Sequence, residues 1–268
     1  MENQRHLYKN SSISYYSFGT GARVVVCFHG YGEDATSFDF LGKYGGSQYS
    51  FISIDLPFHG HTEWKEELSF TINDLQQIVK EIPELKNRKL ILLGFSLGSR
   101  VALCLYQAMP KQIDKIVLLA PDGLKVNFWY WLSTQTWIGK KLFAFTMNHP
   151  GWFFGILKIF NKLGLVNVSI YKFINYYIGD KDARLSLYHR WIALRKMKPV
   201  ISLIKSFITE YKTTVRLLYG KHDRIILSVR GEKFKKGIEE QCRLTVIHTG
   251  HQVLHEKHAK EIIDALDN

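Results

Sequence analysis

The sequence of 268 residues contains few cysteines and no long apolar run. Its three cysteines, Cys27, Cys104 and Cys242, are an odd number without short spacing, which argues against a disulfide framework or a zinc site. We expect them to be inert small residues in or near the core of a protein from a reducing compartment. The chain lacks an uninterrupted stretch of about 18 or more apolar residues, so we expect no transmembrane helix. The first residues lead into a polar segment and predict no secretory signal, so we expect a cytoplasmic protein.

Acidic residues are nearly absent from one segment. Between residues 125 and 205, two acids (Asp180 and Asp182) stand against thirteen Lys and Arg, a net charge of +11 out of +12 for the chain. Such a surface favours an acidic partner, such as an acyl-carrier protein, or an anionic membrane, which would make the protein peripheral at the membrane. The same charge also fits a solvated basic face. The chain has no nucleic-acid-binding motif, so we expect no nucleic-acid partner.

The most informative motif is Gly-x-Ser-x-Gly at residues 94–98. It follows an apolar run at 89–93, typical of a buried strand, and precedes a helical pattern over 101–109. Strand, motif and helix in this order are the context of a nucleophile elbow, in which a strained turn exposes a serine hydroxyl. The two glycines lack a Cβ, so the helix can cross close to the strand. Ser96 is therefore the candidate nucleophile.

Three further motifs each follow a predicted strand: His-Gly-Tyr-Gly at 29–32, Gly-Lys-His-Asp at 220–223 and Thr-Gly-His at 249–251. An oxyanion loop followed by Ser, Asp and His resembles the α/β-hydrolase superfamily, and the likeness covers nearly the whole chain. The resemblance implies an α/β fold with a mostly parallel central sheet flanked by helices.

The pattern of strands and helices agrees with this fold. Before about residue 124, uniformly apolar strands alternate with helices, which predicts a parallel sheet covered on both faces. From 125 to 205 the strand pattern disappears and aromatic residues crowd in, including five of the six tryptophans. This segment resembles the helical cap of the family. We expect a core from residues 1–124 and 206–268 and a cap at 125–205, whose aromatics either line an acyl pocket or fill the cap's own core.

His251 is the best candidate for the base that takes the proton of Ser96. It lies in the loop after the last predicted strand, where the resemblance places the catalytic histidine. The alternatives are His248, which we place within that strand as a structural residue, and His255 and His258, which we place on the surface of the terminal helix.

Asp223 is the favoured orienting acid, and Asp122, which follows the sixth predicted strand, is its rival because some family members place the acid there. The backbone N–H groups of Tyr31 and Leu97 would form the oxyanion hole. Leu97 begins the elbow helix, whose dipole adds positive potential. We interpret His29 as a loop-shaping residue.

The sequence departs from the family pattern in its loops. Phe58 stands where glycine is usual, Ser99 replaces a second glycine after the elbow, and no proline follows Asp223 closely. These departures change loop geometry more than chemistry, and they leave the subfamily open.

A serine at the elbow disfavours haloalkane dehalogenases and epoxide hydrolases, which use an aspartate there. We expect a serine hydrolase that cleaves an ester-type acyl bond of a small-molecule substrate through an acyl-enzyme, with no cofactor and no metal. A thioesterase and a carbon–carbon bond hydrolase are alternatives, as is a small-molecule receptor of the same fold with little turnover.

Overall fold

The computed structural model describes residues 2–125, 128–163 and 178–268. They form two compact units. The first contains Met1–Glu66, Phe70–Lys125 and Lys196–Asn268, and the second contains Glu67–Ser69 and Val126–Arg195.

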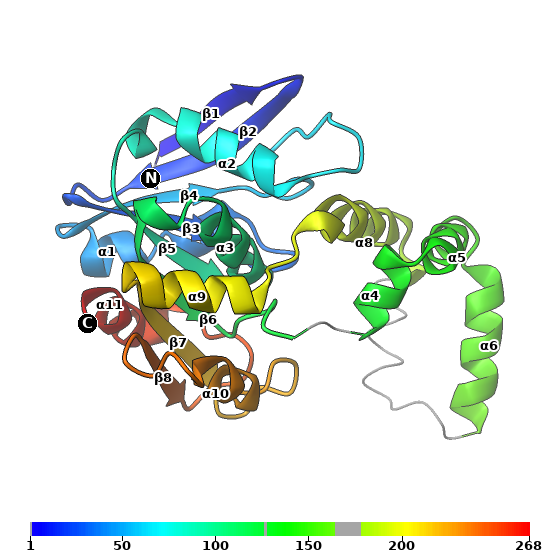
Figure 1. The fold of residues 1–268 in the computed structure, drawn as a ribbon. Helices are drawn as coiled ribbons and strands as arrows, with labels where there is room; N and C mark the ends of the chain where they lie inside the picture. Colours follow the sequence, from blue (N-terminus) through cyan, green and yellow to red (C-terminus); the bar gives the residue numbers. More distant parts are fainter. Residues whose placement is uncertain (1, 126–127, 164–177) are drawn as a thin grey trace. The chain divides into compact units, whose positions relative to one another are not determined.

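The described part of the first unit is built on an eight-stranded sheet with the order β1-β2-β4-β3-β5-β6-β7-β8 (Figure 1). Its strands are β1 (Glu2–Tyr8), β2 (Ser11–Phe18), β3 (Arg23–Phe28), β4 (Tyr49–Ile54), β5 (Leu90–Phe95), β6 (Ile113–Leu119), β7 (Thr214–Gly220) and β8 (Cys242–Ile247). The pairs β1–β2 and β2–β4 are antiparallel and all the others are parallel. The predicted mostly parallel sheet is therefore confirmed.

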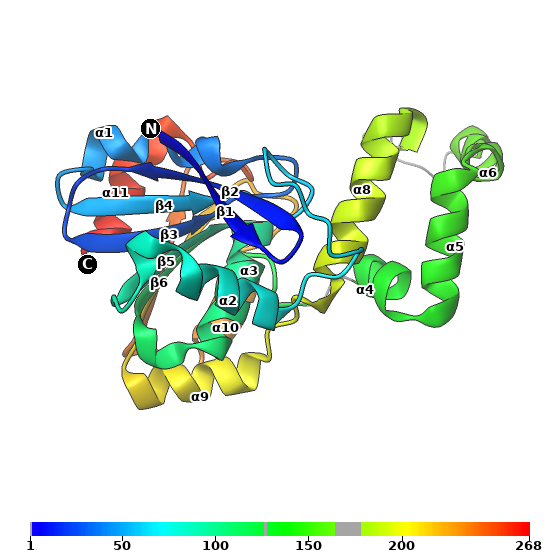
Figure 2. The ribbon, with the colours of Figure 1, turned by 90° about the horizontal axis from the view of Figure 1, so that it is seen from above.

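Helices cover both faces of this sheet (Figure 2). On one face lie α1 (Leu41–Gly45) and α11 (Ala259–Asp267), and on the other lie α2 (Ile72–Glu81), α3 (Leu97–Ala108) and α9 (Ile201–Tyr211). The short α10 (Val229–Lys235) packs on β8. Because both faces are covered, the central strands β3 and β5 are almost wholly buried and apolar, and so is β6 from Ile116 to Leu119.

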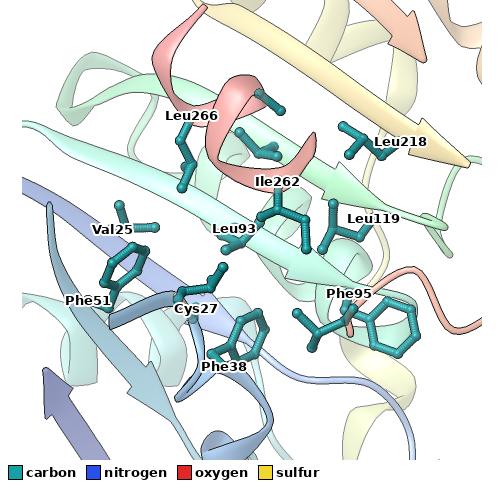
Figure 3. Packing of buried hydrophobic residues seen from close by; sticks show 14 of the residues in the cluster. Val25, Cys27, Phe38, Phe51, Leu93, Phe95, Leu119, Leu218, Ile262 and Leu266 are labelled. Carbon is teal, nitrogen blue, oxygen red and sulfur yellow. The ribbon is translucent and has the colours of Figure 1, made fainter. Parts of the chain in front are cut away.

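The core under α11 holds alternate residues of neighbouring strands. Leu93 and Phe95 of β5 lie beside Leu119 of β6, and Ile262 and Leu266 of α11 pack on them (Figure 3). The three cysteines are free and buried, as predicted. Burial raises the pKa of the Cys104 thiol to about 12 and that of Cys242 to about 11, so both remain protonated thiols at neutral pH.

The described residues of the second unit are helical, without a strand. They form α4 (Phe128–Gln135), α5 (Trp137–Asn148), α6 (Gly151–Lys162) and α8 (Lys181–Ala193). Thr136 caps α5 by accepting a hydrogen bond from Gly139 N, and Asp180 caps α8 in the same way through Ala183 N. The sequence placed the cap at 125–205, whereas this unit ends at Arg195 and α9 belongs to the first unit. None of the helices described here combines the length and apolar character needed to span a bilayer.

Candidate active site

Ser96 occupies a strained turn between β5 and α3. Its backbone has φ 48° and ψ −113°, a conformation that costs a non-glycine residue about 1–3 kcal/mol. Backbone hydrogen bonds from Ser96 N to Leu119 O (2.9 Å) and from Asp122 N to Ser96 O (3.1 Å) hold the turn against the end of β6. A Cβ on Gly98 would lie 1.8 Å from the carbonyl oxygen of Phe28. Only glycine there lets the start of α3 lie so close to the end of β3.

His251 connects the serine to an aspartate by two contacts. Its Nε2 lies 3.1 Å from Ser96 Oγ, and its Nδ1 lies 2.8 Å from Asp223 Oδ2. The loops that carry Asp223 and His251 are joined by backbone hydrogen bonds from Lys221 N to Ile247 O (2.8 Å) and from His222 N to Thr249 O (2.9 Å). Parallel pairing of β7 with β8 thus brings the two side chains together at one edge of the sheet.

The Asp223 carboxylate is well supplied with donors. Its side chain is 0% exposed, and Oδ1 accepts hydrogen bonds from the backbone N–H groups of Ile225 (2.7 Å) and Ile226 (2.9 Å). Together with His251 these donors compensate the burial of a negative charge. A carboxylate at Asp223 can accept a hydrogen bond from Nδ1–H. In that tautomer the Nε2 lone pair faces the serine hydroxyl.

Asp122 has other partners. Its Oδ2 forms an ion pair with Arg100 Nε at 3.4 Å, and its Oδ1 accepts a hydrogen bond from Gly123 N at 2.8 Å. The structure thus brings Asp223, and not Asp122, to His251.

The expected places of two other histidines, His248 and His258, were wrong. β8 ends at Ile247, so His248 follows the strand and does not lie within it. His258 is not a surface residue, because it is 7% exposed at the end of a 3₁₀ turn (Glu256–His258) that precedes α11 and directs its ring inward. Burial lowers its pKa. His255 is exposed, as expected.

His29 shapes the loop after β3, as predicted. Its buried ring accepts a hydrogen bond at Nε2 from Leu56 N (3.1 Å) and donates from Nδ1 to Gly30 O (2.8 Å). Tyr31 follows this fixed segment. Leu97 is the first residue of α3, where a backbone N–H has no acceptor within the helix. The oxyanion hole from Tyr31 and Leu97 remains a prediction.

Sequence reasoning missed Glu33. Its Oε2 accepts a hydrogen bond from Gly30 N (3.3 Å) and its Oε1 accepts one from the side-chain nitrogen of Gln252 (2.8 Å). Burial raises the pKa of this carboxyl group. Glu33 follows Gly30 by three residues, and this spacing could have indicated a contact within the loop. Its contact with Gln252 could not be predicted, because the two residues are 219 positions apart.

The structure places two of the residues that depart from the family pattern, Phe58 and Ser99. Phe58 has φ 64°, the left-handed region that glycine usually occupies. Ser99 is fully buried, and its hydroxyl donates to Gly94 O at 2.8 Å. Phe58 thus takes up the left-handed conformation without glycine, and Ser99 fits in the first turn of α3. Among the residues described, no group of three or more His, Cys, Asp or Glu side chains could hold a metal ion.

A protein-family model described as alpha/beta hydrolase fold matches residues 23–258. An esterase of Mycobacterium tuberculosis is 28% identical over 117 residues, which are 42% of this chain and 39% of that protein. Alignments with three other curated relatives cover 33%, 32% and 37% of those proteins, about a third of their length.

Solved structures resemble the whole chain. A thermophilic esterase from Thermogutta terrifontis superposes with a TM-score of 0.69 at 16% identity, over 100% of this chain and 98% of that one. A thioesterase domain from the curacin biosynthetic pathway gives 0.67 at 16% identity, over 100% and 99%. At this identity the likeness shows the fold alone.

Proposed function

Because this chain belongs to the alpha/beta hydrolase fold family, we propose that it is a serine hydrolase that cleaves an ester-type acyl bond through an acyl-enzyme on Ser96. The observation that carries the proposal is the continuous contact from Ser96 Oγ through His251 to the buried carboxylate of Asp223. A serine hydroxyl is a weak nucleophile until a neighbouring base accepts its proton.

In the first half of the proposed reaction, Ser96 Oγ attacks the carbonyl carbon of the ester and His251 Nε2 takes the hydroxyl proton. The imidazolium that forms is stabilised by the ionised Asp223, which keeps its charge throughout. The oxyanion of the tetrahedral intermediate would accept hydrogen bonds from the backbone N–H groups of Leu97 and Tyr31. Collapse of the intermediate breaks the bond to the leaving alcohol, which receives the proton from His251.

In the second half, water attacks the acyl carbon while His251 takes a proton from the water. The second tetrahedral intermediate collapses, the bond from the acyl carbon to Ser96 Oγ breaks, and Oγ receives that proton from His251 as the acid product leaves. The elbow supports this sequence because its strained turn holds Oγ at 3.1 Å from the base in the resting enzyme, so little reorganisation is needed before attack.

The same triad can act on a thioester, because only the leaving group differs, and on a carbon–carbon bond next to a carbonyl. The fold does not decide among these substrates. A panel of p-nitrophenyl esters and acyl thioesters, each with acyl groups of graded length, therefore tests which bond this protein cleaves.

A fluorophosphonate probe tests the proposal directly. We expect covalent labelling of the wild type at Ser96, identified by peptide mass, and no labelling of the Ser96→Ala variant. Absence of labelling in a folded wild-type protein, together with no turnover on the panel, would instead favour a non-catalytic small-molecule receptor.

A further inference from the structure

The helix α5 exposes an apolar face. Trp137, Ile138, Leu142 and Phe145 fall on one side of it and are 66%, 71%, 52% and 53% exposed. The opposite side already packs within the second unit, where the ring of Phe143 lies 5.6 Å from that of Trp191 in α8. A helix of a water-soluble domain directs one apolar stripe to the core and polar residues outward, so α5 carries a second apolar stripe with no place in that core.

The helix α6 extends this surface. The ring of Trp152 lies 6.3 Å from that of Phe145, and Ile156, Ile159 and Phe160 of α6 are also exposed. Among the residues of α6, only Leu157 is buried. We call the exposed apolar residues of α5 and α6 the apolar face: Trp137, Ile138, Leu142, Phe145, Trp152, Ile156, Ile159 and Phe160. An apolar surface of this extent marks an interaction site.

The charge on these helices is purely basic. No acidic residue occurs between Asp122 and Asp180, whereas α5 and α6 contain Lys140, Lys141, Lys158 and Lys162. Lys141 Nζ lies 3.9 Å from the centre of the Trp137 ring, so the ammonium group and the indole form a cation–π contact on the helix surface. Tryptophan and lysine beside aliphatic residues are typical of helices that lie in the interface of an anionic bilayer.

The contacts of the arginines count against an acidic protein as the partner. Arg184 is buried, and its guanidinium donates to the carbonyl oxygens of Met147 and Ile178, each at 2.6 Å. Arg195 donates to the carbonyl oxygens of Leu68 and Ile192. These two arginines therefore hydrogen-bond to the backbone of the second unit and are less available to an acidic partner. The lysines of α5 and α6 lie among exposed aromatic and aliphatic side chains, which fit lipid better than a polar acidic surface.

We propose that the apolar face of α5 and α6 inserts into the headgroup region of a bilayer that contains anionic lipid, with the lysines at the level of the phosphates. Apolar insertion supplies binding that persists in salt, and the lysines supply preference for anionic lipid, which salt screens. This binding does not depend on the proposed hydrolase activity.

The test is co-sedimentation of the full-length chain with vesicles. One set contains phosphatidylcholine alone and the other contains equal parts of phosphatidylcholine and phosphatidylglycerol. We expect binding to the mixed vesicles to exceed binding to phosphatidylcholine by about tenfold or more at low salt, with a blue shift of tryptophan fluorescence. Failure of the wild type to bind either vesicle at low salt would overturn the proposal.

Two variants separate the apolar and basic contributions. Trp137→Ser with Leu142→Ser and Phe145→Ser should weaken binding to mixed vesicles by about tenfold or more, whereas Leu7→Ser, at an exposed apolar residue of β1, should not. Lys141→Gln with Lys158→Gln and Lys162→Gln should remove most of the preference for anionic lipid. The matched control changes three exposed lysines of the first unit to Gln: Lys86, Lys233 and Lys260.

Because all the substituted side chains are exposed, the circular dichroism of each variant should match the wild type. Equal binding by the triple Ser variant and the wild type would overturn the proposal. A second outcome would also overturn the proposal: the wild type is a dimer in gel filtration and does not bind vesicles, and the triple Ser variant is a monomer. A second copy of the chain would then cover the apolar face. Binding of an acyl-carrier protein without binding of vesicles would also overturn it, in favour of an acidic partner.

Discussion

The Glu33 carboxylate accepts a hydrogen bond of 2.8 Å from the side chain of Gln252, the residue that follows His251. Its second oxygen accepts the N–H of Gly30, one residue before Tyr31. One carboxylate therefore joins the loop that carries a candidate oxyanion donor to the loop that carries the candidate base.

Replacement of Glu33 by Ala should lower kcat on an activated ester by about ten- to a hundredfold with little change in KM, because misplacement of catalytic groups by about 1 Å can cost a hundredfold. Glu33→Gln keeps an oxygen acceptor for one of the two bonds and should recover part of the loss. Steady-state kinetics of the three proteins test this positioning role. An unchanged kcat in Glu33→Ala would contradict it.

The raised pKa of Glu33 predicts that the stability of the protein depends on pH. Burial raises the folded-state pKa of Glu33 above its ordinary value, so the folded protein binds more protons than the unfolded chain between the two values. The free energy of unfolding therefore falls as pH rises through this window. Glu33→Gln removes this titration, so its free energy of unfolding should depend less on pH across the window, whatever the loss of one hydrogen bond costs. Urea unfolding across the window checks the difference in slope.

Ser96→Ala should abolish ester hydrolysis, with a loss on the order of a millionfold in turnover. Alanine retains the Cβ, so the strained turn and the thermal unfolding midpoint should change little. Hydrolysis of an activated ester and a thermal melt are the two measurements. A variant that keeps more than about a tenth of the activity would remove Ser96 from the proposed role.

Asp223→Asn should lower kcat by about four orders of magnitude, because the amide favours the wrong tautomer of His251. Asp122→Asn is the matched comparison, since it changes a carboxylate that pairs with Arg100 instead. We expect its kcat to stay close to the wild-type value. If Asp122→Asn were the more damaging change, the orienting acid would have to be reassigned.

Asp74→Ala should lower the free energy of unfolding by about 1–3 kcal/mol. Asp74 completes the capping box of α2 with Thr71, and it accepts hydrogen bonds of 2.7 Å from both Tyr8 and Lys9. Although burial alone would raise its pKa, the hydrogen bonds from Lys9, Thr71 and Tyr8 lower it to about 2. The stability that these bonds supply is present above the ordinary carboxyl pKa and is lost as pH falls toward 2. Chemical unfolding at neutral and acidic pH measures both effects, and a wild-type pH profile in the variant would contradict them.

The fold and the candidate triad were predictable because each depends on a local pattern. Apolar runs marked the central strands, and Ser96, Asp223 and His251 each follow a predicted strand. The carboxyl ends of parallel strands meet at one edge of a sheet, which is why the three side chains meet in the structure. The burial of His258 could not be predicted in this way. The helical pattern placed this residue inside a terminal helix that starts at Glu256, whereas α11 begins at Ala259, after a 3₁₀ turn.

The sequence by itself determined the order of the strands along the chain, the residues that compete for the site and the basic charge of 125–205, because these are properties of neighbouring residues. Only the tertiary structure decided which partners each polar group finds. Glu33 and Gln252 are 219 residues apart, and the carbonyl groups that hold Arg184 include that of Met147, 37 residues away. Local patterns indicate that a charge or an apolar stripe exists, whereas the contacts between distant segments determine whether it is buried, paired or left at the surface.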